Sequence, residues 1–271
     1  MTGHLDIVCA SDAAGRSYLR QQSFRAPIHL SKPHLDEGVL VVNVVNPTAG
    51  LFAGDRIDCK VRVEAGAALL LTAPSACRAH RMHEGCARVA QEFGISKGGF
   101  MECLPEVFIP QGGTRYRQTT RLRVEEGGEL LFFESLAPGR VAAGESFEFA
   151  ELAWDTDAFV GDTQILRERY RITPGDEAVR TLRRRFDHAY YASCIAVSPR
   201  LADDSVCWGN LRTACNQDVV IGCSSLGSGG WIIKCVTLGS IALRSVLAEI
   251  RRELYRSLER REPSLRRAGA A

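Results

Sequence analysis

The alternation of apolar and polar residues predicts β-strands over most of the chain. In residues 56–63 every second residue is apolar and its neighbours are charged, a period of two that gives a strand one dry face and one wet face. Residues 115–124 repeat this pattern, although their inner face is partly polar. Residues 39–45 are almost continuously apolar and predict a strand that is covered on both faces.

Three segments of this β region resemble one another and indicate a structural repeat. Each has a strand, a glycine turn and a returning strand, and the turn glycines are Gly66, Gly98 and Gly127. Their spacing of roughly 30 residues predicts stacked β units with one continuous core, as in a β-solenoid, and glycine suits turns that require a positive φ. An ordinary β meander with hairpins at similar intervals is the alternative.

The end of each unit leads to a further prediction. Every returning strand runs into a loop that contains a proline, at Pro74, Pro105 and Pro138. Proline ends the hydrogen-bonded ladder because it lacks an N–H donor. If the units stack in register, the three loops lie at the same edge of the β structure.

The last quarter of the chain changes to helical spacing. Residues 201–215 predict one helix, and residues 231–236 predict a strand. A second helix is expected to begin with Ser240 as its N-cap and to end at Pro263. Charged residues, Arg251 among them, fall mostly on the solvent face of this helix. Its expected apolar face consists of Ile241, Val246, Leu247, Ile250, Leu254 and Leu258.

These elements predict a mainly β protein. It would consist of stacked strand and hairpin units with β-helix-like winding, followed by a small C-terminal α/β portion with two helices. No shift in composition marks a linker, so a single domain over residues 1–271 is expected. Within it we expect a mainly β core (1–190), the α/β portion (191–262) and a loose tail (263–271).

Charge and length argue against several classes of partner. The 271 residues have a formal net charge of +2, which gives no reason to expect nucleic acid or a membrane as a partner. No apolar stretch approaches the roughly 20 residues of a membrane span, and the start shows no signal peptide, so a cytoplasmic location is expected. The ten cysteines form no Cys-x-x-Cys pair and are expected to be reduced thiols.

One spacing in the chain is typical of metal ligands. Cys77, His80, His83 and Cys86 follow one another at intervals of three residues, and thiolate and imidazole ligands suit nickel or zinc. The set could hold a metal in a stand-alone nickel- or zinc-binding protein. Chance proximity in a cysteine-rich chain is the competing interpretation.

Motifs for catalysis are missing. The sequence contains no P-loop, no Gly-x-Ser-x-Gly and no His-Glu-x-x-His, so a non-enzymatic protein is expected. A metallohydrolase with Glu84 or Glu102 as its base remains a further alternative.

Four acidic residues stand in expected loops and strand ends: Asp55, Glu102, Glu134 and Glu145. Most such carboxylates are solvated surface groups. If they converged in a wet interior, they would attract a divalent cation and release it readily, because carboxylates hold nickel less tightly than thiolate or imidazole does.

Four loop segments resemble the motifs of a known family. They are residues 46–55 (NPTAGLFAGD), 72–81 (TAPSACRAHR), 101–106 (MECLPE) and 138–147 (PGRVAAGESF). Their order and spacing resemble those of the urease accessory protein UreD family, also called UreH. The likeness covers most of the chain.

The sequence also departs from that family's motifs. Thr48 and Ala49 stand where the family has Pro-Gly, Cys103 replaces a tryptophan and His80 replaces a tyrosine. Three members of the Cys/His set are not motif positions at all: Cys77, His83 and Cys86. Transient nickel binding at Cys77, His80 and His83 would therefore be a feature of this chain.

The resemblance implies a function and a set of site residues. It implies a protein without a reaction of its own, which binds UreF, UreG and the structural subunits of urease and holds no tight cofactor. Nickel would pass through an internal water-filled passage. By motif position, Asp55, Glu134 and Glu145 would line that passage or be structurally critical, and Arg140 would orient one of them by a charge-assisted hydrogen bond. The motif loops supply Gly50, Gly54, Thr72, Pro74, Glu102, Pro105, Gly139 and Gly144.

Overall fold

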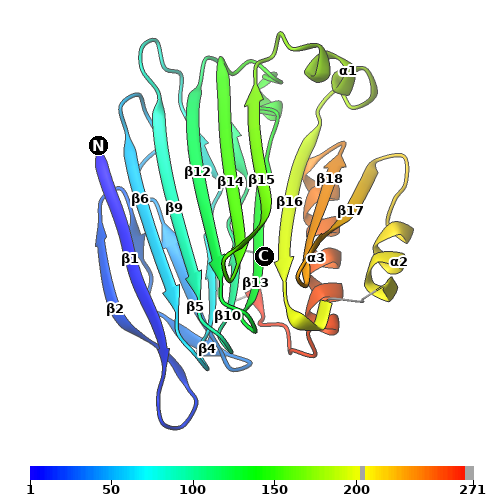
Figure 1. Cartoon of the computed structure of the whole chain (residues 1–271). Coiled ribbons are helices and arrows are strands. Elements are labelled where there is room, and N and C mark those ends of the chain that lie inside the picture. Colours follow the sequence, from blue (N-terminus) through cyan, green and yellow to red (C-terminus); the bar gives the residue numbers. More distant parts are fainter. Residues whose placement is uncertain (202–204, 266–271) are drawn as a thin grey trace.

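Two large β-sheets face each other in the computed structural model, which describes residues 1–201 and 205–265 (Figure 1). The seven-stranded sheet has the order β15-β14-β12-β9-β6-β1-β2 and lies toward the viewer in Figure 1. Its strands are β1 (Thr2–Ser11), β2 (Ser17–Arg25), β6 (Arg56–Val63), β9 (Ala87–Ile95), β12 (Arg115–Val124), β14 (Glu151–Val160) and β15 (Thr163–Ile172).

The second sheet has eleven strands, eight of them in the order β17-β18-β16-β13-β10-β7-β5-β3. Along this path the strands are β3 (His29–Leu30), β5 (Val39–Val45), β7 (Ala68–Thr72), β10 (Phe100–Leu104), β13 (Glu129–Leu136), β16 (Tyr190–Val197), β17 (Val219–Gly227) and β18 (Gly230–Thr237). Three short strands join its side: β4 (His34–Asp36), β8 (Cys77–Ala79) and β11 (Phe108–Pro110).

The chain winds repeatedly from one sheet to the other. β6, β9, β12 and β14 are parallel neighbours in the first sheet, and β5, β7, β10 and β13 are parallel neighbours in the second. The two strands beside each repeat glycine therefore lie in opposite sheets and do not pair as a hairpin would. This arrangement confirms the predicted mainly β fold with β-solenoid-like winding.

The glycine turns stack on one another at one end of the sheets. Gly66, Gly98 and Gly127 have φ values of 73°, 72° and 85°, the positive φ that the sequence predicted. The N–H of Gly66 donates to the Gly98 carbonyl at 3.3 Å, and the N–H of Gly98 donates to the Gly127 carbonyl at 3.0 Å. The glycine N–H of each turn is thus hydrogen-bonded to a carbonyl of the next turn, which keeps the repeats in register.

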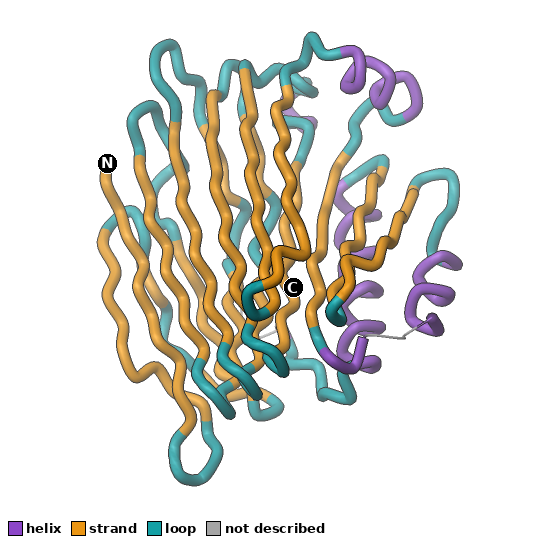
Figure 2. The backbone as a smooth tube through the Cα atoms, viewed as in Figure 1, coloured by secondary structure: helices purple, strands orange, loops and turns teal. Residues whose placement is uncertain are grey.

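The proline loops lie together at the other end of the second sheet. Thr72 pairs with Leu104, so the loops with Pro74 and Pro105 leave adjacent strands at the same level. β13 runs parallel to β10 and continues further before Pro138. The predicted gathering of the three loops is confirmed, and Figure 2 shows the connections at the two ends of the strands.

The space between the sheets holds the largest apolar core. Phe93 of β9 and Phe132 of β13 meet there with ring centroids 5.3 Å apart, and both are 1–2% exposed. The predicted strands at 39–45, 56–63 and 115–124 have these bounds in the structure and send alternate residues into this core. Each fully buried Leu or Phe contributes about 1.5–3 kcal/mol through removal from water.

Two helices from the C-terminal part of the chain cover the outer face of the second sheet. The described α-helices are α1 (Glu177–Arg185), α2 (Ser205–Thr213) and α3 (Ser240–Ser257). α2 and α3 match the two predicted C-terminal helices and pack on β16, β17 and β18, as Figure 1 shows. α1 was not predicted, because Val179 is its one buried residue and its apolar pattern is too short to recognise. No helix among the described residues is long and apolar enough to cross a membrane.

Helix α3 differs from its prediction in three respects. Gly239, not Ser240, occupies the N-cap position, and the helix ends at Ser257, well before Pro263, because the chain turns at Glu259, whose φ is 51°. Ile241 is 82% exposed although it was expected on the buried face, whereas Arg251 was expected on the solvent face and is 3% exposed. The predicted tail falls largely on residues 266–271, outside the described residues, and the division into portions stays a prediction.

Candidate functional site

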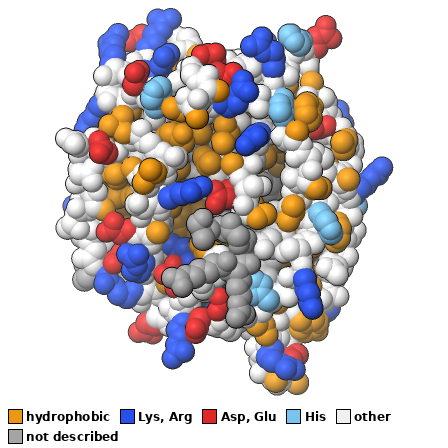
Figure 3. Space-filling model, turned by 180° about the vertical axis from the view of Figure 1, so that it is seen from behind, with side chains coloured by type: hydrophobic (Ala, Val, Ile, Leu, Met, Phe, Trp, Pro, Cys, Tyr) orange, Lys and Arg blue, Asp and Glu red, His pale blue; other side chains and the backbone are white. Residues whose placement is uncertain are grey.

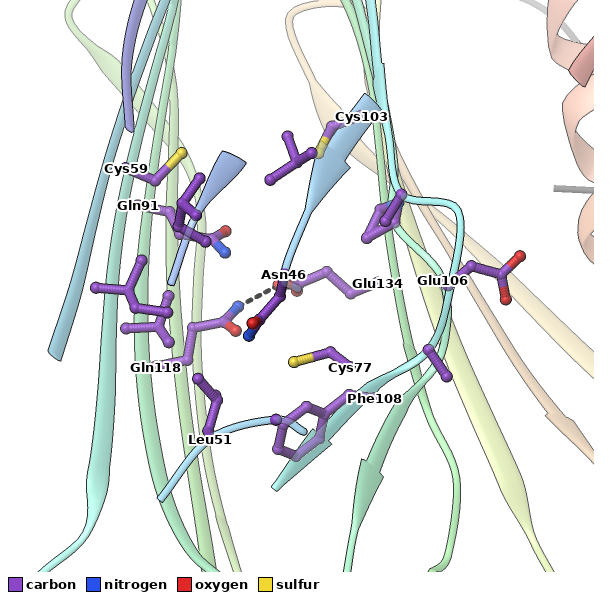
Figure 4. A pocket seen from close by; sticks show the side chains of 18 of the residues that line it. Asn46, Leu51, Cys59, Cys77, Gln91, Cys103, Glu106, Phe108, Gln118 and Glu134 are labelled. Carbon is purple, nitrogen blue, oxygen red and sulfur yellow. Dashed lines mark hydrogen bonds between the residues drawn. The ribbon is translucent and has the colours of Figure 1, made fainter. Parts of the chain in front are cut away.

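A cavity of about 440 Å³ lies between the two sheets near the end where the proline loops gather. Strands of both sheets form its walls, and the loops at 46–51 and 73–78 form part of its rim. Figure 4 shows side chains from opposite walls pointing into it. The lining is mixed: apolar residues such as Val89 and Phe108 alternate with amides, thiols and two carboxylates, of which Glu106 points away from the cavity (Figure 4).

Glu134 supplies the carboxylate that projects into the cavity. It lies inside β13, where Phe132 and Leu136 face the space between the sheets and Leu131 and Phe133 face the helices. The period of two places Glu134 on the inner face, in a position that an apolar residue would ordinarily fill. The sequence placed this residue near a loop, but it lies within the strand, and its side chain is half-buried at the cavity wall.

Two neutral groups hold this carboxylate in place. The indole N–H of Trp154 donates to Oε1 at 2.9 Å, and the amide of Gln118 donates to the same oxygen. Among the described residues no cation pairs with Glu134. Burial raises the pKa of the Glu134 carboxyl to about 7, and the nearby charge of Glu168 raises it too, while the two hydrogen bonds lower it in part. Near neutral pH both the protonated and the ionised form of this group are therefore populated.

A chain of polar side chains extends from Glu134 along the inner face of the first sheet. Gln118 accepts a hydrogen bond from the Tyr116 hydroxyl at 2.6 Å and donates to the Thr120 hydroxyl at 3.1 Å. Thr120 in turn reaches Gln91 at 3.5 Å. The partly polar inner face predicted for residues 115–124 is this chain, but its role in orienting Glu134 could not be read from the sequence.

A second polar cluster lies beyond Glu134, and here the carboxylate is paired. Lys234 of β18 forms an ion pair with Glu168 of β15 and donates to the Tyr170 hydroxyl at 2.7 Å. The Tyr170 and Tyr191 hydroxyls are 3.0 Å apart. Glu168 thus has a cationic partner, whereas Glu134, the other carboxylate in this region between the sheets, has none among the described residues.

Asp55 has a structural position and does not line the cavity. Its side chain is buried and accepts the backbone N–H of Phe52 at 2.8 Å, and it pairs with the amino group of Met1. These bonds close the loop of residues 46–55 against the start of β1. Of the two roles expected for Asp55, the geometry favours the structural one, in which Asp55 stabilises the loop.

Glu145 and Arg140 form a pair in the loop after β13. Arg140 donates through Nε to Glu145 Oε2 at 2.8 Å and through a second nitrogen to the other oxygen, the two-pronged contact that a guanidinium makes with a carboxylate. The Gly112 N–H also donates to Glu145. The Arg140 contact holds the pKa of the Glu145 carboxyl below its usual value. The expected pairing of Arg140 with a motif acid is present, at the surface rather than in the cavity.

Glu102 lies on the opposite face of the second sheet and is fully buried. Arg251 of α3 donates to both of its oxygens, at 2.5 and 2.9 Å, and the Tyr255 hydroxyl donates at 2.6 Å. Arg251 also pairs with Glu262. This motif acid therefore fixes the C-terminal helix to the sheet and has no access to the cavity.

The remaining motif residues shape the loops around the cavity. Gly50 has a φ of 136°, and a Cβ there would lie 2.3 Å from the Arg78 carbonyl oxygen, so a side chain does not fit. Gly139 has a φ of 154°, and a Cβ there would lie 2.9 Å from the Glu145 carbonyl oxygen. The Thr72 hydroxyl donates to the Leu104 carbonyl at 2.7 Å and ties β7 to β10. The others, all in turns or at strand ends, are Gly54, Pro74, Pro105 and Gly144.

The structure does not bring the Cys/His set together. Cys77 faces the cavity, whereas the ring of His80 stacks on Phe52 with centroids 4.4 Å apart and reaches the Ala49 carbonyl at 2.9 Å. His83 and Cys86 line a separate hollow. Among the described residues no group of three or more His, Cys, Asp or Glu side chains is arranged to hold a metal ion.

The fold and the cavity define a class of protein: a two-sheet β-solenoid whose interior holds a cavity with a mixed apolar and polar lining, in which Glu134 has no cationic partner among the described residues. Comparison with known proteins then gives the family. The family profile described as UreD urease accessory protein matches residues 1–270, and the chain belongs to this family.

Known relatives can be aligned with most of this chain. The urease accessory protein UreD of Opitutus terrae is 37% identical over 264 residues, which cover 95% of this chain and 96% of that protein. The UreD protein of Acetivibrio thermocellus is 27% identical over 89% of this chain and 93% of its own length. That of Mycolicibacterium gilvum is 30% identical over 73% of this chain and 72% of its own length. The resemblance inferred from the four loop motifs is confirmed.

Proposed function

We propose that this chain is a non-catalytic scaffold for urease maturation. It docks on apo-urease together with UreF and UreG and helps deliver nickel to the urease active site. It works in the cytoplasm, holds no tightly bound cofactor and carries nickel as cargo in transit. The names of its relatives support the accessory role, and the internal cavity supports the part in nickel delivery.

The observation that carries the proposal is Glu134 at the wall of that cavity. A carboxylate without a cationic partner attracts a divalent cation, and oxygen ligands hold nickel weakly enough to release it. A pKa of about 7 lets an arriving cation displace the proton and lets the proton return when the cation leaves. The neighbouring Gln118 and Trp154 bind one carboxylate oxygen only, so Oε2 accepts no hydrogen bond among the described residues.

The surface supports the part of the proposal that concerns docking. Figure 3 shows hydrophobic side chains gathered around a hollow in the rear face, with charged side chains around them. Elsewhere on the surface Leu238 is 39% and Ile241 is 82% exposed at the start of α3. Contiguous exposed apolar surface of this kind is typical of sites that a partner protein covers.

The test is maturation of urease with and without the chain. The structural subunits are co-expressed with the other accessory proteins, and urease activity and nickel per active site are measured. We expect both to fall strongly when the chain is omitted and to return when it is supplied. Urease that loads nickel equally well without the chain would contradict the proposal.

A further inference from the structure

Two potential metal ligands face the same part of the cavity from different strands. Cys77 of β8 pairs with Phe108 of β11, and Phe108 pairs with Leu136 of β13. Cys77 is therefore in the same row as Leu136, and Glu134 is two residues earlier on the same face of β13. Figure 4 shows the Cys77 thiol and the Glu134 side chain pointing into the cavity from the same side.

The electrostatics of Tyr116 support this proximity. Burial raises the pKa of the Tyr116 hydroxyl well above its usual value, and the charges of Cys77 and Glu134 raise it further. Both groups are thus close enough to act on the same hydroxyl.

The two groups also have free binding capacity, whereas the oxygens of the neighbouring amides already accept hydrogen bonds. The Cys77 thiol makes no hydrogen bond among the described residues, and neither hydrogen bond to Glu134 uses Oε2. The amides beside them are occupied: Asn46 Oδ1 accepts two bonds from Thr48, and Gln118 Oε1 accepts one from Tyr116. Sulfur and carboxylate oxygen are therefore the atoms that an ion in this part of the cavity would meet.

We propose that Cys77 and Glu134 form a transit site for a borderline divalent cation such as Ni²⁺. The thiolate supplies affinity that a carboxylate alone lacks, and the remaining positions stay with water, so that the ion can leave. When the ion binds, the Cys77 proton and any proton on Glu134 go to solvent, and the metal–sulfur and metal–oxygen bonds form without oxidation or reduction. The site rests on the proposed function, since it presumes a nickel ion in the cavity.

This site differs from the ligand set that the sequence predicted. It keeps Cys77, replaces the distant His80, His83 and Cys86 by Glu134, and is built across strands rather than along one loop. Cys77 is not a motif position of the family, so the sulfur ligand belongs to this chain.

The test uses Co²⁺ as a spectroscopic probe of the isolated full-length chain. A cobalt–thiolate bond gives a charge-transfer absorption that oxygen ligands do not give. Cys215 is exposed and Cys223 is half-buried, and the two lie close enough for the charge of Cys215 to raise the pKa of Cys223, so both are first changed to Ser to remove adventitious binding. The background variant should show the cobalt–thiolate band.

The variants then assign the ligands. In this background, Cys77→Ser and Cys77→Ala should abolish the band, while Cys59→Ser, which removes another thiol of the cavity wall, should keep it. Glu134→Gln should weaken cobalt binding by more than the roughly 10- to 100-fold that loss of a residue hydrogen-bonded to a metal ligand costs. Circular dichroism shows that each variant is folded. A background protein without the band, or a band that survives in both Cys77 variants, overturns the proposal.

The experiments distinguish a wrong metal site from a wrong proposed function. If the chain is required for urease maturation but shows no cobalt–thiolate band, the transit site is wrong and the scaffold function stands. If the band depends on Cys77 and urease matures without the chain, the metal site stands and the proposed function is wrong.

Discussion

Glu102 and Glu134 lie on neighbouring strands of the same sheet but in opposite environments. Glu102 faces α3, is fully buried and receives three hydrogen bonds from Arg251 and Tyr255. Glu134 faces the cavity and receives two hydrogen bonds from neutral groups. A carboxylate that is fully paired fixes the structure, whereas one that is held in place without a cation can bind one. The two faces of the second sheet thus differ: on one a carboxylate is paired with a cation, and on the other it is not.

The largest expected effect is loss of the ion pair behind the sheet. Arg251→Ala leaves Glu102 buried without its cation, and breaking a buried pair in this way costs about 3–5 kcal/mol. We expect the free energy of unfolding in urea to fall by this amount. Arg180→Ala, which removes a cation from an exposed pair with Glu177, is the control and should leave stability unchanged. A similar midpoint for both variants would show that the two faces do not differ as described.

The next effect concerns the loop at the rim of the cavity. Gly50→Ala places a Cβ against the Arg78 carbonyl at a backbone conformation that alanine rarely adopts. We expect a loss of about 1–3 kcal/mol from backbone strain, smaller than that of Arg251→Ala. Gly175→Ala is the control, because a Cβ there meets nothing within 4 Å and φ is ordinary. Equal stability of the two variants, measured by thermal unfolding, would contradict the account of this loop.

The pH dependence of stability separates Glu134 from a paired carboxylate. Its pKa is about 7 in the folded protein against 4.5 in the unfolded chain, so the folded state binds the proton more tightly. The contribution of Glu134 to stability is therefore present below pH 4.5 and is lost as pH rises through 7. We expect this loss to be about 1–3 kcal/mol, with water in the cavity reducing it.

Glu134→Gln removes this titration. Unfolding of the variant should depend less on pH between 4.5 and 7, and at pH 8 the variant should be at least as stable as the wild type. A variant with the wild-type pH profile would show that Glu134 is not the group that titrates.

The smallest effect is expected at the surface pair of Arg140 and Glu145. Arg140→Ala should change the urea midpoint by no more than its error, because exposed ion pairs contribute little. A large loss of stability would mean that the loop after β13 depends on this pair.

The sequence predicted the β-solenoid well because its signals are local. The alternation at 56–63 and the repeat at Gly66, Gly98 and Gly127 follow directly from strand and turn geometry. The roles of Arg251 and Glu134 could not be predicted in the same way. Whether a charge is buried, and whether a cation lies beside it, depends on elements that can be more than a hundred residues apart, as the pair of Arg251 on α3 and Glu102 on β10 shows.

The Cys/His set shows a related limit. Regular spacing suggested four ligands, but Cys77 begins strand β8, and on an extended chain residues three apart point to opposite faces, so His80 stacks on Phe52 and does not line the cavity. The residue that completes the polar wall, Gln118, stands at an inner position of a strand that otherwise alternates regularly. A polar residue at an inner strand position was the signal that could have identified the cavity.

The measurement that tests the central claim most directly is nickel per urease active site after maturation with Glu134→Gln. Glu92→Gln is the matched control, since Glu92 is exposed on the outer face of the first sheet. Both variants must first co-purify with urease like the wild type. The account predicts a strong loss of nickel with Glu134→Gln and none with Glu92→Gln. Full nickel loading with Glu134→Gln would contradict it.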